Sequence, residues 1–276
     1  MKKISIKDGN VVFPKGITQI HVNTFTEEMR KEIKHVVIPS TVTKIGRLTF
    51  AWCTNLTYIE LPNTINVIER DAFLFCISLT SIKIPYSVTE ISRSAFNGCS
   101  NLSSIVVDEG NKKYDSREGC NAINLTKNNE LIRGFKTTII PNSIMKIGTE
   151  AFSGTFNFIP VESGETTRFL KNGITSINIP NSVTHINDYA FAACIDLTNI
   201  KIPDSVTYIG YHTFKFCEKL QTINFSGTVE RICKNAFDQC DNLRKILVPA
   251  EKACYYKKRL PKELHHLIEE KSPVEQ

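Results

Sequence analysis

The sequence lacks the long apolar run of a membrane-spanning helix. No stretch of the 276 residues approaches the roughly 20 apolar residues that cross a bilayer. The amino-terminal segment has two lysines but no apolar core, because residues 8–10 read Asp-Gly-Asn, and no lipid-anchor motif is present. We therefore expect no membrane span. The protein is expected to be cytoplasmic if Met1 is the true start, and cell-surface or secreted if a signal sequence has been removed.

The sequence also lacks a concentration of positive charge. The net charge of +6 comes from 34 basic and 28 acidic residues spread along the chain. Lys and Arg form no stripe with interleaved aromatic residues, so we expect no nucleic-acid partner. A composition of 41% hydrophobic and 22% charged residues is that of an ordinary globular protein.

Catalytic and metal-binding motifs are missing as well. The chain contains no C-x-x-C, G-x-S-x-G, Walker loop, G-x-G-x-x-G or H-E-x-x-H pattern, and no His stands at zinc-ligand spacing from a Cys pair. We expect no catalytic residues, no metal and no cofactor. The alternative is an enzyme hidden in an irregular segment, but Asp115, Arg117 and Glu118 are too few and too loop-bound to support it.

What the chain does contain is a 23-residue repeat. Pro39, Pro62 and Pro85 mark its period, which resumes at Pro180 and Pro203. An isoleucine column comprises Ile20, Ile45, Ile68, Ile91, Ile147, Ile186, Ile209 and Ile232. A phenylalanine column comprises Phe25, Phe50, Phe73, Phe96, Phe152, Phe191, Phe214 and Phe237. Such regular columns predict stacked structural units that share one core.

Each repeat ends in the pattern L-x-x-I-x-I, which predicts a short strand. Its β-branched residues and near alternation suit a strand, and the proline that follows cannot donate a ladder hydrogen bond and ends it. Stacked at roughly 4.8 Å, the strands form parallel ladders. Each column then becomes a row of identical side chains, with phenylalanine as the central row.

The full pattern, L-T-x-I-x-I-P-x-S-V-T-x-I-x-x-x-A-F-x-x-C, resembles the BspA-like leucine-rich repeats of bacteria. The resemblance covers about residues 11–249, and residues 114–143 resemble a longer variant unit of the same family. It implies a leucine-rich-repeat solenoid: short parallel strands stacked in a curved right-handed solenoid, mostly β and irregular. It also implies no known enzymatic activity and, typically, adhesion to host matrix proteins or to other cells.

Departures from the period define the expected domain organisation. We expect a solenoid over 1–249 with insertions at about 109–135 and 153–173, and a carboxyl-terminal cap over 250–276. In the first insertion, CNAINLT and ELIRGF flank the turn-rich KNNE and predict a β-hairpin. The strand TTII that follows has Thr138 where isoleucine is usual.

The other departures leave alternatives open. The second insertion holds Phe156, Phe158, Ile159 and Phe169, which suit either a satellite loop covering its own patch of solenoid or a contact loop. In the tail, Leu260, Leu264, Leu267 and Ile268 have helical spacing, and Pro261 fits a first helical turn. This predicts a capping helix over the last open strand, although its apolar stripe could instead dock on a partner helix.

Six of the nine cysteines occupy one column of the repeat. They are Cys53, Cys76, Cys99, Cys194, Cys217 and Cys240. Neighbours in the column would lie roughly 5 Å apart, within the range of a disulfide. Other repeats have Thr155 or Glu28 at this position, which a required cross-link would not allow. We therefore favour buried free thiols that pack as small hydrophobic groups.

The exposed face of the strands is the candidate binding surface. Its outward positions are mostly Thr, Ser, Asn and Lys, which suits broad polar contact with a protein better than a small-molecule pocket. The candidate site residues are Tyr58, Glu60, Lys83, Lys136, Asn178, Asn199, Lys201, Asn224 and Lys245. We expect a monomer that adheres to a host matrix or cell-surface protein. The alternatives are an intracellular scaffold or host-directed effector using the same face, and a plain solvated surface.

Overall fold

The computed structural model describes residues 4–157, 168–170 and 172–272. The chain divides into two compact units, residues 1–126 and residues 127–276, and each is described by itself below. The predicted organisation into a 1–249 solenoid and a 250–276 cap stays a prediction.

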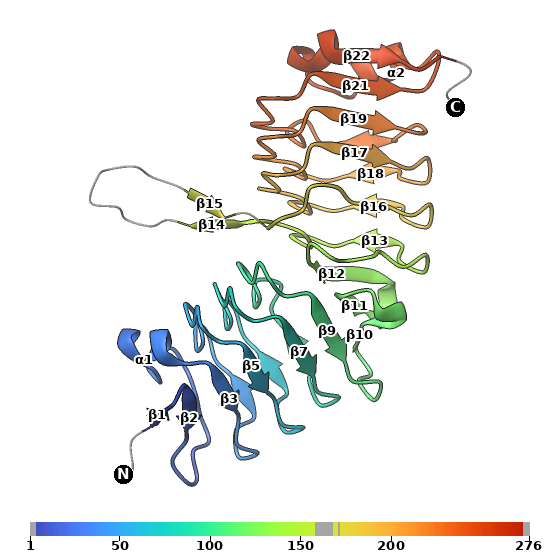
Figure 1. Cartoon of the computed structure of the whole chain (residues 1–276). Coiled ribbons are helices and arrows are strands. Elements are labelled where there is room, and N and C mark those ends of the chain that lie inside the picture. Colours follow the sequence, from blue (N-terminus) through green and yellow to red (C-terminus); the bar gives the residue numbers. More distant parts are fainter. Residues whose placement is uncertain (1–3, 158–167, 171, 273–276) are drawn as a thin grey trace. The chain divides into compact units, whose positions relative to one another are not determined.

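The first unit is a stack of rungs, each carrying two short strands (Figure 1). After an initial hairpin, strands of the L-x-x-I-x-I pattern form the first row, and two-residue strands at the isoleucine column form the second. The first row comprises β1 (Ser5–Lys7), β2 (Asn10–Val12), β3 (His35–Val37), β5 (Tyr58–Glu60), β7 (Ser81–Ile84) and β9 (Ser104–Val107). The second comprises β4 (Lys44–Ile45), β6 (Val67–Ile68) and β8 (Glu90–Ile91). Pairing between rungs is parallel, and only the initial hairpin β1–β2 is antiparallel among these strands.

The second unit repeats this arrangement. Its second row comprises β12 (Glu130–Gly134), β13 (Lys146–Ile147), β16 (His185–Ile186), β18 (Tyr208–Ile209) and β20 (Arg231–Ile232), all paired in parallel. Its first row comprises β17 (Asn199–Ile202), β19 (Thr222–Phe225), β21 (Lys245–Val248) and β22 (Ile268–Glu270), also parallel. The predicted stack of short parallel strands is confirmed, whereas the two-residue strands of the second row were not predicted.

The phenylalanine column forms the core of each unit. Phe50, Phe73 and Phe96 stack with ring centroids 5.5 and 5.2 Å apart, and Phe152 and Phe191 stack at 5.1 Å. The Phe N–H donates to the Ala carbonyl of the next rung, as in Phe50 to Ala72 at 2.8 Å. The column therefore fixes the backbone register as well as filling the interior.

The atypical first repeat contains a helix that the sequence analysis did not predict. Helix α1 (Glu27–Glu32) lies between Phe25 and Ile33, an interval two residues longer than the one from Phe50 to Leu56 in the next repeat. Thr26 caps it, because its Oγ1 accepts a hydrogen bond from the Met29 N–H at 3.3 Å. Glu27 and Glu28 lie in the first turn, where the helix dipole favours acidic groups.

The insertion at about 109–135 contains the strands that the predicted hairpin needs. They are β11 (Ala122–Leu125) in the first unit and β12 in the second, with the 3-10 turn η2 (Thr126–Asn128) between them in sequence. A further short strand, β10 (Tyr114–Asp115), pairs antiparallel with β11 and is followed by the 3-10 turn η1 (Arg117–Gly119).

The predicted strand TTII is wrong. Residues 137–140 form no strand, because the Thr138 side chain accepts from the Phe135 N–H at 2.7 Å and its N–H returns to the Phe135 carbonyl at 3.0 Å. This local turn replaces the ladder, as threonine side chains often do. Ile139 is left 77% exposed.

The insertion at about 153–173 begins and ends in an antiparallel pair, β14 (Thr155–Asn157) and β15 (Arg168–Leu170). This pair projects from the stack of the second unit (Figure 1). Phe158 and Ile159 lie outside the described residues, so the choice between a satellite loop and a contact loop stays open.

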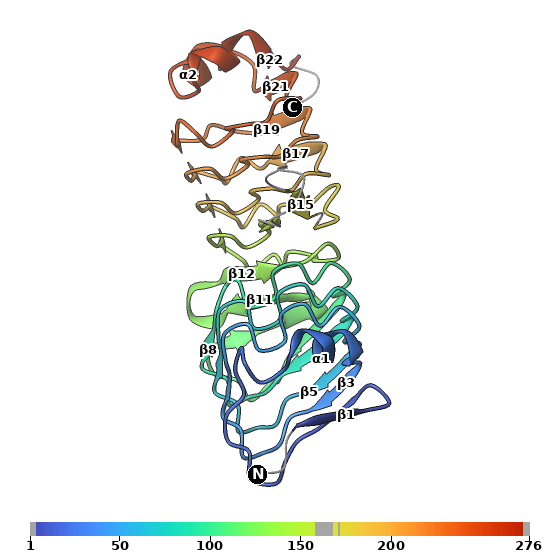
Figure 2. The same cartoon turned by 90° about the vertical axis from the view of Figure 1, so that its left-hand side faces the viewer.

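The carboxyl-terminal cap contains a short helix and also a strand. Helix α2 (Ala253–Lys257) precedes Pro261. Of the residues with helical spacing, Leu264 and Leu267 lie in the 3-10 helix η3 (Lys262–Leu267) and Ile268 begins β22, whereas Leu260 lies between α2 and η3. Strand β22 pairs with β21 and so covers the last rung. In Figure 2, α2 and β22 lie at the carboxyl-terminal end of this stack.

Candidate functional site

The candidate site lies on the exposed side of the first-row strands, here called the strand face. It consists of the outward residues of β3, β5, β7 and β9 in the first unit and of β17, β19 and β21 in the second. Each strand alternates, so that Ser81 and Lys83 point outward while Ile82 and Ile84 are buried. A period of two is the geometric consequence of the extended chain.

The first-unit part of the strand face combines apolar and charged groups. The register places His35 opposite Tyr58 and Val37 opposite Glu60. It also places Lys83 opposite Val106. Val37, Tyr58 and Val106 are all about half exposed. The face is therefore less uniformly polar here than the sequence analysis expected.

A shallow groove of about 410 Å³ on this face contains three of the candidate residues, Tyr58, Glu60 and Lys83. The Tyr58 hydroxyl donates to Glu60 Oε2 at 3.2 Å. This bond and the charge of Glu60 raise the pKa of the Tyr58 phenol, which keeps its proton. Lys83 Nζ lies 3.0 Å from Asp108 Oδ2. The groove thus presents a phenol, a carboxylate and an ammonium group within adjacent rungs.

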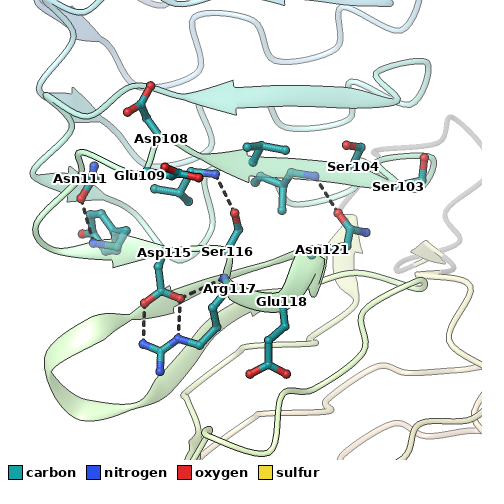
Figure 3. Close-up of a pocket in the computed structure, with 15 residues that line it drawn as sticks. Ser103, Ser104, Asp108, Glu109, Asn111, Asp115, Ser116, Arg117, Glu118 and Asn121 are labelled. Carbon is teal, nitrogen blue, oxygen red and sulfur yellow. Dashed lines mark hydrogen bonds and ion pairs between the residues drawn. The ribbon is translucent and has the colours of Figure 1, made fainter.

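A second cavity, of about 480 Å³, lies where the first-unit ladder ends at β9 (Figure 3). Asn121 Oδ1 accepts from the Ile105 N–H at 2.8 Å, and Ser116 Oγ accepts from the Val107 N–H at 2.9 Å. The two side-chain oxygens replace the carbonyl groups of a neighbouring strand, so that these two N–H groups at the edge of the sheet have acceptors. The sequence analysis missed both residues, although the long interval after Asp108 signals that a strand is absent.

Asp115 and Arg117, two charged residues of this cavity, form an ion pair with each other. Arg117 binds Asp115 through Nε to Oδ1 at 2.8 Å and Nη2 to Oδ2 at 2.6 Å, and Thr126 Oγ1 donates to Oδ2 at 2.9 Å. Burial opposes ionisation of Asp115, but the hydrogen bonds from Arg117, Asn124 and Thr126 outweigh it and lower the pKa. Glu118 points away from the pair in Figure 3. A carboxylate held in this way is a poor general base, which favours a structural role.

The second-unit part of the strand face is more polar. Asn199, Thr222 and Lys245 lie side by side on β17, β19 and β21, as do Lys201 and Asn224. Lys245 forms an ion pair with Glu269 of the cap at 2.6 Å, which compensates its charge. Lys201 is exposed on the same face.

Two candidate residues lie off the strands. Lys136 and Asn178 are exposed, but neither residues 135–140 nor residues 172–180 form a strand. The structure therefore brings together Tyr58, Glu60 and Lys83 in one unit, and Asn199, Lys201, Asn224 and Lys245 in the other.

The described residues offer no arrangement for metal chemistry. Within residues 4–157, 168–170 and 172–272, no three His, Cys, Asp or Glu side chains are grouped so that they could hold a metal ion. The column thiols are buried, and burial raises the pKa of Cys53 to about 12. Protonated thiols are poor metal ligands and poor nucleophiles.

No helix among the described residues is both long and apolar enough to cross a membrane.

Comparisons with solved structures identify leucine-rich repeat proteins. A leucine rich cell surface protein of Faecalibacterium prausnitzii matches 79% of the chain at 26% identity, with a TM-score of 0.52. A leucine-rich repeat protein of Eubacterium ventriosum matches 90% at 21% identity, with a TM-score of 0.55. The pneumococcal vaccine antigen PcpA matches 83% at 19% identity, with a TM-score of 0.50. The chain spans 60%, 77% and 66% of these three proteins.

No curated protein matches the chain significantly. A family model does match it: the BspA type leucine rich repeat region, in six copies, covers residues 18–132 and 165–258. The matched segments contain every residue of the phenylalanine and isoleucine columns except Ile147 and Phe152. The chain belongs to the BspA-type leucine-rich repeat family.

Proposed function

We propose that the protein is a non-enzymatic adhesion module that binds a host matrix or cell-surface protein through its strand face. Leucine-rich repeat solenoids are in general interaction scaffolds that bind proteins. Adhesion is supported by the likeness to a leucine rich cell surface protein at 26% identity. Export to the cell surface is part of this proposal.

The observation that carries the proposal is the groove around Tyr58, Glu60 and Lys83. It combines an exposed aromatic ring with a carboxylate and an ammonium group on adjacent strands. Tyrosine is enriched among residues that dominate protein interfaces, because it buries a large area while its hydroxyl keeps a polar contact. The neighbouring Val37 and Val106 extend the apolar contact to both sides.

The test compares two double variants for binding to immobilised fibronectin, laminin and fibrinogen by surface plasmon resonance. Tyr58→Ser with Lys83→Ser removes a tyrosine and a lysine from the groove. We expect it to weaken binding at least about tenfold, as loss of an interface anchor does. The Lys83 change also removes its ion pair with Asp108, so circular dichroism must first show an unchanged fold.

The matched control is Tyr211→Ser with Lys234→Ser, which removes the same residue types from exposed positions outside the strand face. We expect less than about a twofold change, since substitutions outside an interface leave binding nearly intact. Loss of binding in the control but not in the groove variant would place the contact elsewhere. Failure of the wild-type protein to bind any of the three would contradict adhesion to these matrix proteins.

A further inference from the structure

A groove of about 570 Å³ lies beside helix α1 in the first unit, away from the strand face. Its apolar lining is Val22, Phe25, Leu48 and Trp52. Trp52 is 47% exposed and Val22 is 42% exposed. A half-exposed tryptophan in a concave apolar surface is a feature of interaction sites rather than of plain solvated surface. We call this surface the Trp52 groove.

Arg30 holds the groove in shape. Its guanidinium donates to the carbonyl oxygens of Val22 at 2.7 Å and Leu48 at 3.2 Å, and also to those of Thr49 and Ala51. One side chain of α1 thereby links the turn at Val22 to the turn at residues 48–51 through hydrogen bonds. Because these bonds form within the protein, the groove is preorganised, and little ordering is required when a ligand binds.

The repeat itself does not require tryptophan at position 52. This position has a left-handed backbone, with φ of 60° at Trp52, and the same position of the next two repeats holds Phe75 and Gly98. Glycine adopts that conformation most easily, whereas a bulky side chain does so at a cost. Leu48, which faces the same groove, is also left-handed, with φ of 55°. The left-handed turn belongs to the repeat, because Ala193 and Phe216 also have a positive φ at this position. The exposed indole ring, and not the backbone, therefore distinguishes position 52.

The floor of the groove is positively charged. Arg30 is only 8% exposed, and among the described residues its hydrogen bonds go to carbonyl groups, with no ion pair to a carboxylate. Carbonyl groups satisfy its N–H donors but do not cancel its charge. At the rim, Lys31 and Glu27 pair at 3.5 Å and offset each other. The groove therefore favours a ligand that carries negative charge beside an apolar group.

The shape of the groove favours a protein side chain over a small molecule. Small ligands bury most of their surface in a cavity, whereas the half-exposed Trp52 shows that this groove is open. Tryptophan and arginine are also the residue types most enriched at the centres of protein interfaces. We propose that the Trp52 groove binds an aliphatic or aromatic side chain of a protein partner that has an Asp or Glu within about three residues of it, one helical turn. This site is separate from the strand face and does not depend on the function proposed above.

The test uses a displayed library of random 12-residue peptides, selected on the whole protein and counter-selected on Val22→Glu. We expect the selected peptides to combine an aliphatic or aromatic residue with a nearby Asp or Glu. Trp52 is the only tryptophan in the chain, so intrinsic fluorescence reports on the groove directly. Synthetic peptides of the selected sequences should shift its emission to shorter wavelength.

Two variants and a matched control define the outcome. Val22→Glu and Leu48→Asn should each weaken peptide binding at least tenfold in fluorescence polarisation, and asparagine tolerates the left-handed backbone at position 48. Val37→Glu makes the same change at a 57% exposed valine on the strand face and should leave binding unchanged. The Tyr58→Ser, Lys83→Ser variant should also bind normally, which separates this site from the proposed adhesion surface.

Several results would overturn the inference. These are a library that yields no peptide distinguishing the wild type from Val22→Glu, selected peptides that are basic or wholly polar, and selected peptides that leave the Trp52 emission unchanged.

Discussion

The thiols of the cysteine column donate hydrogen bonds to the backbone of the preceding rung. Cys76 Sγ lies 3.1 Å from the Phe50 carbonyl oxygen, and Cys99 Sγ lies 3.1 Å from that of Phe73. In the second unit, Cys217 Sγ lies 3.2 Å from the Phe191 carbonyl. A buried carbonyl needs a donor, and a thiol provides a weak one without adding a charge. The predicted buried free thiols are confirmed for all six column positions.

This arrangement predicts that the thiols react slowly in the native state. Seven of the nine cysteines are buried, Cys233 is half-buried, and Cys254 alone is exposed. Because the thiolate is the reactive form, a raised pKa and burial both slow modification. We expect no more than two thiols to react rapidly with a disulfide reagent at pH 8 in native protein, and all nine in denaturant.

The same thiols make stability depend on alkaline pH. Burial raises the pKa of Cys53 from 9.0 to about 12, and it also raises the pKa values of Cys76 and Cys217. The folded state therefore favours the protonated thiol. This contribution is complete below about pH 9, and it is lost as pH rises from about 9 to about 12. Urea titrations at pH 7, 8.5 and 10 should show the decrease above pH 9, and six rapidly reacting native thiols would contradict the whole account.

At the residue scale, the sequence predicts what repeats and misses what does not. The phenylalanine and cysteine columns follow from the period alone, because each copy meets the same neighbours. Arg30 stands outside every column, and its role depends on carbonyl groups that only the folded turns bring together. Gly134 also has a role that the period does not reveal. Its N–H donates to the Ala151 carbonyl, as the N–H of a column phenylalanine donates to the alanine carbonyl of the next rung. The Phe152 ring leaves no room for a Cβ at position 134.

At the element scale, strands are predictable where they are long enough to alternate. β7, β9, β17, β19 and β21 show the full pattern of alternating exposed and buried residues. Apart from β12, the second-row strands have only two residues, too few for any periodicity. Helix α1 was missed for a related reason, since six residues allow fewer than two turns.

The cap depends on Tyr256, which is fully buried in α2. Its hydroxyl donates to the Gly227 carbonyl at 2.7 Å, and its ring packs on Phe225 with centroids 4.6 Å apart. Tyr256→Phe keeps the ring but leaves that carbonyl without its donor. We expect a loss of about 1–3 kcal/mol in the free energy of unfolding, measured by urea titration.

Tyr86→Phe is the matched control, because Tyr86 is half exposed whereas Tyr256 is buried. It should change the free energy of unfolding by less than about 0.5 kcal/mol. Equal effects of the two variants would mean that the Tyr256 hydroxyl contributes nothing to docking of the cap.

At the scale of the whole molecule, the sequence predicts a family and a fold better than a site. The columns identify a stack of rungs, and the strand face follows from their alternation. The Trp52 groove does not follow, because α1 belongs to the first repeat and Arg30 of this helix links the turns that line the groove. Site residues on a repeat scaffold are the positions where the columns vary, so periodicity cannot identify them.

The last prediction concerns cooperativity along the chain. The same 23-residue repeat occurs in both compact units, and this predicts that they unfold together, because the repeats of one solenoid stabilise their neighbours. Trp52 reports on the first unit alone, whereas far-ultraviolet circular dichroism reports on both. Phe191→Ala in the second unit removes a ring stacked between Phe152 and Phe214, at 5.1 and 5.4 Å, and should cost about 3–5 kcal/mol.

If unfolding is cooperative, Phe191→Ala lowers the urea midpoint of the Trp52 signal and of the circular dichroism signal by the same amount. Phe73→Ala makes the equivalent change in the first unit, where Phe50 and Phe96 stack on Phe73, and should do the same. A Trp52 midpoint that stays unchanged in Phe191→Ala, while the circular dichroism curve separates into two steps, would show that residues 1–126 and 127–276 unfold independently. The predicted 1–249 solenoid would then consist of two independent folding units that are built from the same 23-residue repeat.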